Sequence, residues 1–348
     1  MESNRYDCVV VGAGLAGLIA AAVAASEGLS VALAATGPGS WVLGDGRLRA
    51  GLPAAAEEEH HLAAAVAFFR QLMDGAGTPY AGELPSRHLL PTILGDFEPV
   101  SLAPGFLWEA DPRDGLRTAV AGIAGLSSFD ENFMADRLQE NARLRGQACI
   151  HEPRRVALRR GVAAPLSALT LAHLFDRDAD FRAGLMESLR AAALGFDRIL
   201  LPCVLGIQAD EHLREECARA AGCRIAELPT VPPSVAGLRL YHRLEKHLRS
   251  RGVEFYMGFP VQSVNIQGKI CRSVALDAPG RPTILRGEMV ILAAGRCGES
   301  LLGAERAGNL QLALPPRSGN ENLCANTARI ASGYRAGLFA AAKDGQYV

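Results

Sequence analysis

A glycine-rich turn lies near the start of the chain, within VVVGAGLAG (Val9–Gly17), and it limits the possible folds more than any other segment. The apolar and small residues Cys8–Gly12 predict a buried strand, and the alanine-rich segment Leu15–Glu27 predicts the helix that follows it. A second strand is expected at Ser30–Ala35. Strand, glycine turn, helix and strand together form the unit that holds a nucleotide pyrophosphate in many α/β proteins.

Each glycine of this turn has a separate role in such a unit. Gly12 permits the tight turn, Gly14 lets the backbone approach the pyrophosphate, and Gly17 lets the helix pack closely on the strand. The free amides and the positive end of the helix dipole then hold the phosphates. Glycine turns also occur in plain strand-to-helix packing, but the helix and the two flanking strands favour nucleotide binding here.

The usual contact with an adenosine ribose is missing. An Asp or Glu about twenty residues after the turn normally binds the ribose hydroxyls. Here the second strand ends in Ala35 and Thr36, and the nearest acid, Asp45, is too far along the loop. Two interpretations remain open: Thr36 and backbone groups hold the ribose, or the ligand has no adenosine half.

Composition limits the class of protein. The 348 residues are 49% hydrophobic, which predicts a large core and two domains. A formal net charge of -1 gives no general electrostatic reason to bind nucleic acid. The apolar run Leu15–Ala25 is too short to span a bilayer, and no secretory signal is recognisable, so we expect a cytoplasmic protein that reaches a membrane only through a partner. The eight cysteines lack the spacing of metal ligands, and no metal site is expected.

The middle of the chain predicts a second domain with a parallel sheet, because short strands alternate there with helices of ordinary length. Gly122 and Gly125 follow its first strand, and their expected role is close packing rather than a second nucleotide site. The expected strands are Thr118–Leu126, Arg155–Leu158 and Asp197–Val204, and the expected helices are Phe129–Arg145, Asp180–Ala193 and Asp210–Ala221.

A basic helix is expected after the proline-rich segment that begins at Leu228. Ser234 is a plausible helix cap, and the helix carries Arg239 and Arg243. These two arginines are candidate contacts for a substrate phosphate or an acidic partner, and a solvated amphipathic helix explains them equally well.

Strands return after Gly252. A hairpin is expected across Gly268, since alternating patterns flank it. The strand Arg286–Gly295 ends in the small residues Ala294 and Gly295, which would let its backbone approach a ligand. Finally, ENLCAN (Glu321–Asn326) leads into a helix expected at Thr327–Lys343.

This order of motifs resembles the two-dinucleotide-binding-domain flavoproteins: GAGLAG, the hairpin, ILAAG, and an ENL strand before the last helix. The central segments GIAGLSSF (Gly122–Phe129), RILLPCVLGI (Arg198–Ile207) and LPTVPPSVAGLRL (Leu228–Leu240) resemble the B subunit of anaerobic glycerol-3-phosphate dehydrogenase. The resemblance implies an α/β fold, namely a Rossmann-like FAD/NAD(P)-binding domain with an inserted second α/β parallel-sheet domain. We place the FAD-binding domain at 1–112 and 250–348, and the inserted domain at 113–249.

The resemblance also implies a function. Such a protein carries FAD, with FMN as the alternative, and works beside a catalytic A subunit and a membrane-anchoring iron-sulfur C subunit. The complex oxidises sn-glycerol 3-phosphate to dihydroxyacetone phosphate and passes electrons to quinone. The expected cofactor contacts are Gly12, Ala13, Gly14, Leu15, Ala16, Gly17, Thr36, Gly44, Gly46, Ala294, Gly295, Asn326 and Thr327.

The last fifty residues depart from this family. The segment between the ILAAG and ENL strands is short, and the glycine-rich loop that normally precedes the last helix is missing. Asn326 and Thr327 therefore stand where glycine amides usually meet the pyrimidine edge of the flavin. This departure supports a second interpretation, a structural subunit with a degenerate flavin site, and a third is another FAD-dependent oxidoreductase.

No residue set identifies the catalytic groups. Oxidation of a secondary alcohol requires a base for the hydroxyl proton and a hydride path to the flavin. Four histidines are candidates without an assigned place, and the catalytic residues stay unassigned: His88, His151, His173 and His242.

Overall fold

The computed structural model of the chain describes residues 4–49, 56–158, 165–278, 283–295, 301, 307–313 and 325–342. Contacts between residues divide the chain into two compact units. Unit 1 comprises Met1–Trp41, Gly51–Leu72 and Leu244–Val348, and unit 2 comprises Val42–Ala50 and Met73–Arg243. The second unit is therefore an insertion into the first.

Unit 1 is built on a mixed sheet of the order β11-β2-β1-β14-β13-β12, with β15 beside β14. β1 lies between β2 and β14 and runs parallel to both. Its apolar residues from Cys8 to Val11 are buried, as is typical of a strand in a parallel sheet. β12 and β13 form an antiparallel hairpin around Gly268, which confirms the predicted hairpin. The strands are β1 (Asn4–Val11), β2 (Val31–Ala35), β11 (Glu254–Met257), β12 (Val261–Gln267), β13 (Ile270–Leu276), β14 (Thr283–Leu292) and β15 (Leu310–Leu312).

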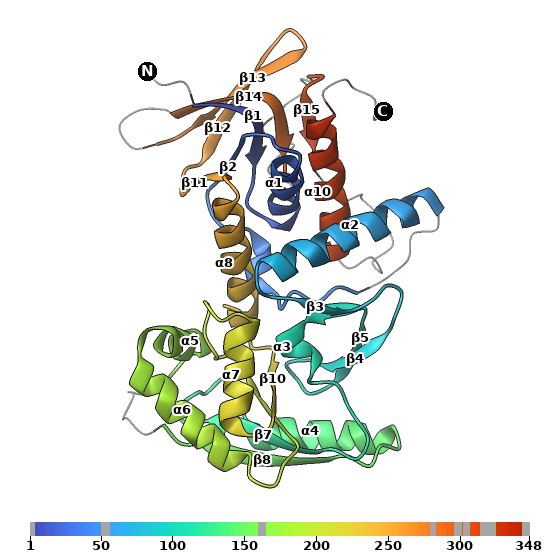
Figure 1. Cartoon of the computed structure of the whole chain (residues 1–348), viewed down its shortest axis with the longest axis vertical. Coiled ribbons are helices and arrows are strands. Elements are labelled where there is room, and N and C mark those ends of the chain that lie inside the picture. The colour runs from blue at the N-terminus through green and yellow to red at the C-terminus, as the bar shows by residue number, and fades with distance from the viewer. Residues whose placement is uncertain are drawn as a thin grey trace. The chain divides into compact units, whose positions relative to one another are not determined.

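Helix α1 (Leu15–Ser26) is buried along its first ten residues, since it packs on the sheet and against α10 (Ala325–Ala341). Figure 1 shows α1 and α10 side by side. Two glycines bring these helices together: a Cβ atom on Gly333 would lie 2.3 Å from the carbonyl oxygen of Ala16, and one on Gly337 would lie 2.5 Å from Cβ of Val23. The apolar character of α1 on every side is typical of such a buried helix.

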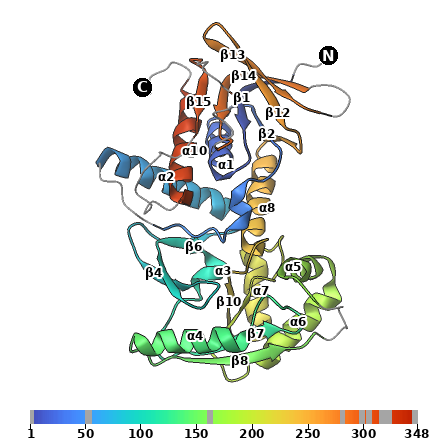
Figure 2. The same ribbon diagram turned by 180° about the vertical axis from the view of Figure 1, so that it is seen from behind.

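Unit 2 contains a four-stranded sheet of the order β10-β9-β7-β8, and all of its pairs are parallel. The predicted parallel sheet in the middle of the chain is thus confirmed. Figure 2 shows α4 running along β7 and β8. The strands are β7 (Arg117–Ile123), β8 (Ile150–Val156), β9 (Arg198–Pro202) and β10 (Arg224–Leu228), and the helices are α4 (Glu131–Leu144), α5 (Ala168–Arg177), α6 (Ala179–Ala192) and α7 (Glu211–Ala221).

Smaller elements complete the described chain. Two short antiparallel pairs lie in unit 2, β3 with β6 and β4 with β5. Two helices have residues in both units: α2 begins in unit 1 and ends in unit 2, and α8 begins in unit 2 and ends in unit 1. These elements are η1 (Ser40–Leu43), α2 (Ala56–Gly75), β3 (Tyr80–Gly82), β4 (His88–Pro91), β5 (Phe97–Val100), β6 (Leu102–Pro104), α3 (Gly105–Trp108) and α8 (Val235–Ser250).

Several details differ from the sequence-based expectations. The strand expected at Arg155–Leu158 is wrong in its bounds, since β8 begins at Ile150. β10 and α5 were not predicted. The contact division also differs from the predicted domain boundaries, because residues 73–112 make their contacts in unit 2. For example, the amide of Leu48 donates to the carbonyl of Leu102 at 2.8 Å, within that unit.

Two predictions about local packing are confirmed. The hydroxyl of Ser234 accepts a hydrogen bond from the amide of Gly237 at 3.2 Å and so caps α8. A Cβ atom on Gly122 would lie 2.0 Å from a carboxylate oxygen of Glu131, so this glycine serves close packing. In the part of the chain that the structure describes, no helix is both long and apolar enough to cross a membrane.

Candidate functional site

The glycine turn of unit 1 is shaped by two close backbone contacts. Gly12 has a φ of +112°, and a Cβ atom there would lie 2.6 Å from the carbonyl oxygen of Ala293. A Cβ atom on Gly17 would lie only 1.8 Å from the carbonyl oxygen of Gly12. Both positions therefore exclude any side chain, in agreement with the roles expected from the sequence.

Gly14 differs from its two neighbours, because a Cβ atom there would meet no atom of the described chain within 4 Å. Its space is open on the side where a ligand would approach. The loop after β2 lies close by, since a Cβ atom on Gly39 would lie 2.8 Å from Cα of Gly14. Gly14 is thus free for an outside group and is bordered by the backbone of Gly39.

The amino end of α1 offers unpaired amides at this position. Gly14 is the N-cap residue, no side chain caps the helix, and its first turn carries no acid. The amide of Leu18 makes the first bond of the helix, to the carbonyl of Gly14 at 3.0 Å. The amides before Leu18 and the positive end of the dipole are therefore directed at an outside acceptor. This cradle of backbone donors fits a pyrophosphate.

The predicted residues that follow β14, Ala294 and Gly295, also lie near the turn. The amide of Ala293 donates to the carbonyl of Val11 at 2.8 Å, and a Cβ atom on Gly12 would lie 3.0 Å from the amide nitrogen of Ala294. Gly295 follows, exposed and with a φ of +58°. The structure thus brings Ala294 beside Gly12, with Gly295 next along the chain, although the sequence separates them from the turn by most of its length.

The strand end at β2 contributes no acid. Ala35 is 6% exposed, and its carbonyl accepts from the amide of Gly258 at 2.9 Å. Thr36 follows as an exposed residue. A ribose contact through Thr36 stays a prediction.

Asn326 and Thr327 lie in the first turn of α10. Thr327 is wholly buried, and Asn326 accepts a hydrogen bond from Arg329 at 3.2 Å. Burial leaves the Thr327 side chain no access to a ligand, so a contact from this residue would have to come from its backbone. The preceding ENL segment (Glu321–Leu323) lies outside the described residues.

Gly44 and Gly46 belong to unit 2. Gly44 is exposed. The carbonyl of Gly46 accepts from the Tyr80 hydroxyl at 3.0 Å, and a Cβ atom there would lie 2.2 Å from a methyl group of Leu240. Gly46 therefore has a packing role within unit 2, and a flavin contact from either glycine stays a prediction.

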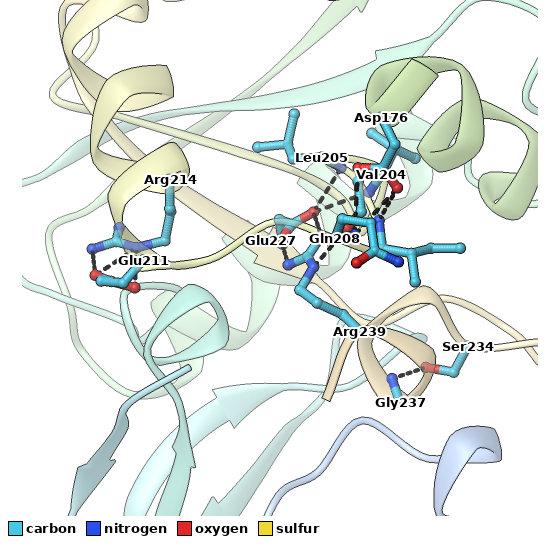
Figure 3. A network of polar contacts seen from close by, with 12 residues as sticks. Asp176, Val204, Leu205, Gln208, Glu211, Arg214, Glu227, Ser234, Gly237 and Arg239 are labelled. Carbon is cyan, nitrogen blue, oxygen red and sulfur yellow. Dashed lines mark hydrogen bonds and ion pairs between the residues drawn. The ribbon is translucent and has the colours of Figure 1, made fainter. Parts of the chain in front are cut away.

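Arg239, a candidate phosphate contact, forms a buried ion pair with Glu227 on β10 (Figure 3). Both side chains are about 2% exposed. Nε of Arg239 donates to the carbonyl of Gly206 at 2.7 Å, and its guanidinium lies 4.5 Å from the ring centroid of Phe106. Arg239 thus links α8, β10 and the loop at Gly206 in the interior of unit 2.

Two carboxylates accept hydrogen bonds from backbone amides of the loop between β9 and α7 and so hold this loop (Figure 3). Glu227 accepts from the amides of Val204 and Leu205 at 3.0 and 3.1 Å. Asp176 accepts from the amides of Ile207 and Gln208 at 2.8 and 3.2 Å. A single carboxylate that accepts two amides satisfies groups that a buried loop would otherwise leave unpaired.

Arg243 donates hydrogen bonds to backbone carbonyls near the same loop. Its Nε donates to the carbonyl of Ala76 at 2.9 Å, and Nη1 donates to that of Gln208 at 3.4 Å. It also pairs with Asp210 at 3.5 Å. A substrate role for Arg239 and Arg243 stays a prediction. The sequence analysis missed Glu227, although an acid inside the apolar run of IAEL (Ile225–Leu228) is a signal for a buried partner.

Two of the candidate histidines lie near a buried arginine in unit 2. His151, Thr118 and Arg198 are register partners on β8, β7 and β9, and Arg198 donates to the Thr118 hydroxyl at 3.2 Å. Asp111 lies 3.7 Å from Arg198 and 3.5 Å from Nε2 of His88. His173, exposed on α5, and His242 on α8 do not belong to this group.

Burial lowers the pKa of His151 to about 4, and the positive charge of Arg198 adds to this effect. The folded chain therefore keeps the imidazole neutral at a pH where the unfolded chain, with a pKa near 6.5, takes up a proton. We expect the free energy of unfolding to be unaffected above pH 6.5 and to fall between pH 6.5 and 4, by roughly 3 kcal/mol. Urea unfolding across this range measures it. In His151→Gln this part of the pH dependence should vanish, and an unchanged slope would contradict the assignment.

Comparison with known proteins places the chain in a family. Residues 54–252, more than half of the chain, match the family model described as FAD binding domain. The B subunit of the anaerobic glycerol-3-phosphate dehydrogenase of Pectobacterium carotovorum is 30% identical over 279 residues, which cover 71% of this chain and 65% of that protein. The protein of the same name from Yersinia enterocolitica is 27% identical over 84% of this chain and 74% of its own length.

Solved structures give a weaker likeness. L-proline dehydrogenase from P. horikoshii aligns over 87% of this chain and 57% of its own, with 11% identity and a TM-score of 0.39.

Proposed function

Because the chain belongs to the FAD binding domain family, we propose that it is the FAD-carrying subunit of a glycerol-3-phosphate dehydrogenase complex. The observation that carries this proposal is the 30% identity to the B subunit of an enzyme with that name. The chain spans 65% of that relative's length. The activity of the whole enzyme is therefore part of the proposal. FAD, rather than FMN, is the cofactor of the family.

The described residues have separate parts in this function. The amides at the amino end of α1 bind the pyrophosphate, and Gly14 leaves room for it. Gly12 and Gly17 keep the turn in the required shape. Bound FAD would accept a hydride equivalent from the secondary alcohol carbon of sn-glycerol 3-phosphate, which gives dihydroxyacetone phosphate. The alcohol proton needs a base, and none of the four candidate histidines is assigned to that role.

The partners follow from the same proposal. A catalytic A subunit and a membrane-anchoring iron-sulfur C subunit would complete the complex, which passes the electrons to quinone. The chain would then sit on the inner face of the cell membrane through its partners.

The visible spectrum of the purified chain tests the proposal first. We expect a flavin band of one equivalent per chain, with FAD as the flavin released on denaturation and identified by its mass. With the partner subunits present, glycerol 3-phosphate should bleach the band. A protein that takes up neither FAD nor FMN would contradict the proposal and favour a structural subunit. A flavin band that glycerol 3-phosphate leaves unbleached would favour another FAD-dependent oxidoreductase.

A further inference from the structure

The ligand-binding edge of the unit 1 sheet carries no carboxylate on its strand ends. The strands β11, β2, β1 and β14 are parallel neighbours, so their carboxyl ends lie along one edge. The sequence contains no Asp or Glu within residues 8–26, 31–44, 255–276 or 289–295, which include these strand ends and the turns after them. A ribose carboxylate is therefore missing from β2 and also from the neighbouring strands that could replace it.

Two acids that flank these ranges in the sequence, Glu254 and Asp45, have other partners. Glu254 starts β11 and is paired in register with Ala32, three residues before the end of β2. Its carboxylate accepts from the hydroxyls of Tyr6 at 2.6 Å and Tyr256 at 3.3 Å. Asp45 accepts from the amide of Arg47 at 3.1 Å and pairs with the guanidinium of that residue. The carboxylate of Glu254 thus lies at the start of β11 and not at the end of β2, and that of Asp45 is paired with Arg47.

The segment that follows Ala35, Thr36–Gly39, carries no charged side chain. Gly39 packs on Gly14, and a Cβ atom on Gly37 would meet nothing within 4 Å. Thr36, exposed, has the only hydroxyl of the stretch Thr36–Gly39. A hydroxyl or a backbone group makes a neutral hydrogen bond with a ribose, which is weaker than one to a carboxylate.

From this edge we infer that the chain binds FAD through its pyrophosphate, with at most a neutral hydrogen bond to the adenosine ribose. The inference rests on the proposed function. Ala35 stands where related nucleotide sites have the acid that binds the ribose hydroxyls, so this residue determines how strongly the adenosine ribose is bound.

The test compares FAD with its analogue that lacks the 2′-hydroxyl of the adenosine ribose. The full chain, freed of flavin, is titrated with each dinucleotide, and quenching of flavin fluorescence gives the Kd. We expect the two Kd values to agree within about fivefold, since at most a neutral hydrogen bond is lost. In Ala35→Glu the carboxylate should tighten FAD binding at least tenfold and leave the Kd of the 2′-deoxy analogue near that of the wild type.

Gln267→Glu is the matched control. It adds the same charge at an exposed residue of β12, at the opposite edge of the sheet from β11, and should change neither Kd. A wild-type preference for FAD of tenfold or more would overturn the inference, whether or not Ala35→Glu folds. So would a folded Ala35→Glu, with a wild-type circular dichroism spectrum, that binds both dinucleotides like the wild type. A wild-type chain that binds neither dinucleotide would overturn the proposed function as well.

Discussion

Replacement of Gly14 by valine is expected to abolish FAD binding without unfolding the protein. The position is open within the chain, since a Cβ atom there has no neighbour within 4 Å, and its backbone angles of -75° and 176° suit any residue. The added side chain would occupy the space through which the pyrophosphate reaches the amides of α1. We expect the Kd for FAD to rise by roughly 100-fold or more, which corresponds to about 2.8 kcal/mol.

The stability of the apoprotein shows whether Gly14→Val loses FAD because the site is blocked or because the chain is misfolded. Urea unfolding of apo Gly14→Val should lie within about 1 kcal/mol of the wild type, the cost of a poorer N-cap residue. Gly14→Ala should give an intermediate Kd. Gly17→Ala is the contrasting variant, because its Cβ atom would lie 1.8 Å from the carbonyl oxygen of Gly12 and should destabilise the apoprotein itself. Normal FAD binding by Gly14→Val would show that the dinucleotide does not approach this turn.

Replacement of Glu227 by alanine is expected to be among the most destabilising single changes in unit 2. It leaves the buried guanidinium of Arg239 without its anion, and it removes the acceptor for the amides of Val204 and Leu205. Loss of one partner of a buried ion pair costs about 3–5 kcal/mol. We expect a fall of this size in the free energy of unfolding, measured with urea and followed by circular dichroism.

Two further variants make the measurement decisive. Arg249 and Glu245 form an i,i+4 pair at 2.8 Å on α8, with the arginine side chain 47% exposed, so Arg249→Ala should cost less than about 1 kcal/mol. The double variant Glu227→Met, Arg239→Met removes both charges and should be more stable than Glu227→Ala. If Glu227→Ala costs no more than Arg249→Ala, the buried pair does not hold the loop.

Local sequence signals predicted the turn well because every part of it is contiguous. Val9–Gly17 contains the strand, the glycines and the start of the helix, and each constraint acts between neighbours. Gly122 was predicted for packing for the same reason. The partner that fills its space, Glu131, starts the next helix, nine residues later.

Pairings between distant segments could not be predicted in this way. From the sequence, Arg239 is only a basic residue on an expected helix. Its ion pair with Glu227 of β10 forms only in the folded chain. β10 was missed because Arg224 and Glu227 interrupt its apolar pattern. β8 is an edge strand with charged residues, so its start at Ile150 carries no clear signal.

The position of β1 has a consequence for folding during synthesis. Its parallel neighbour β14 begins at Thr283, whereas the last residue of unit 2 is Arg243. The inserted unit can therefore complete its contacts while the first strand still lacks one of its two neighbours. Pairing over such a sequence distance is slow and leaves an apolar strand exposed in the meantime. For the nascent chain, the segment at most risk of aggregation is thus the strand that later supports the cofactor turn.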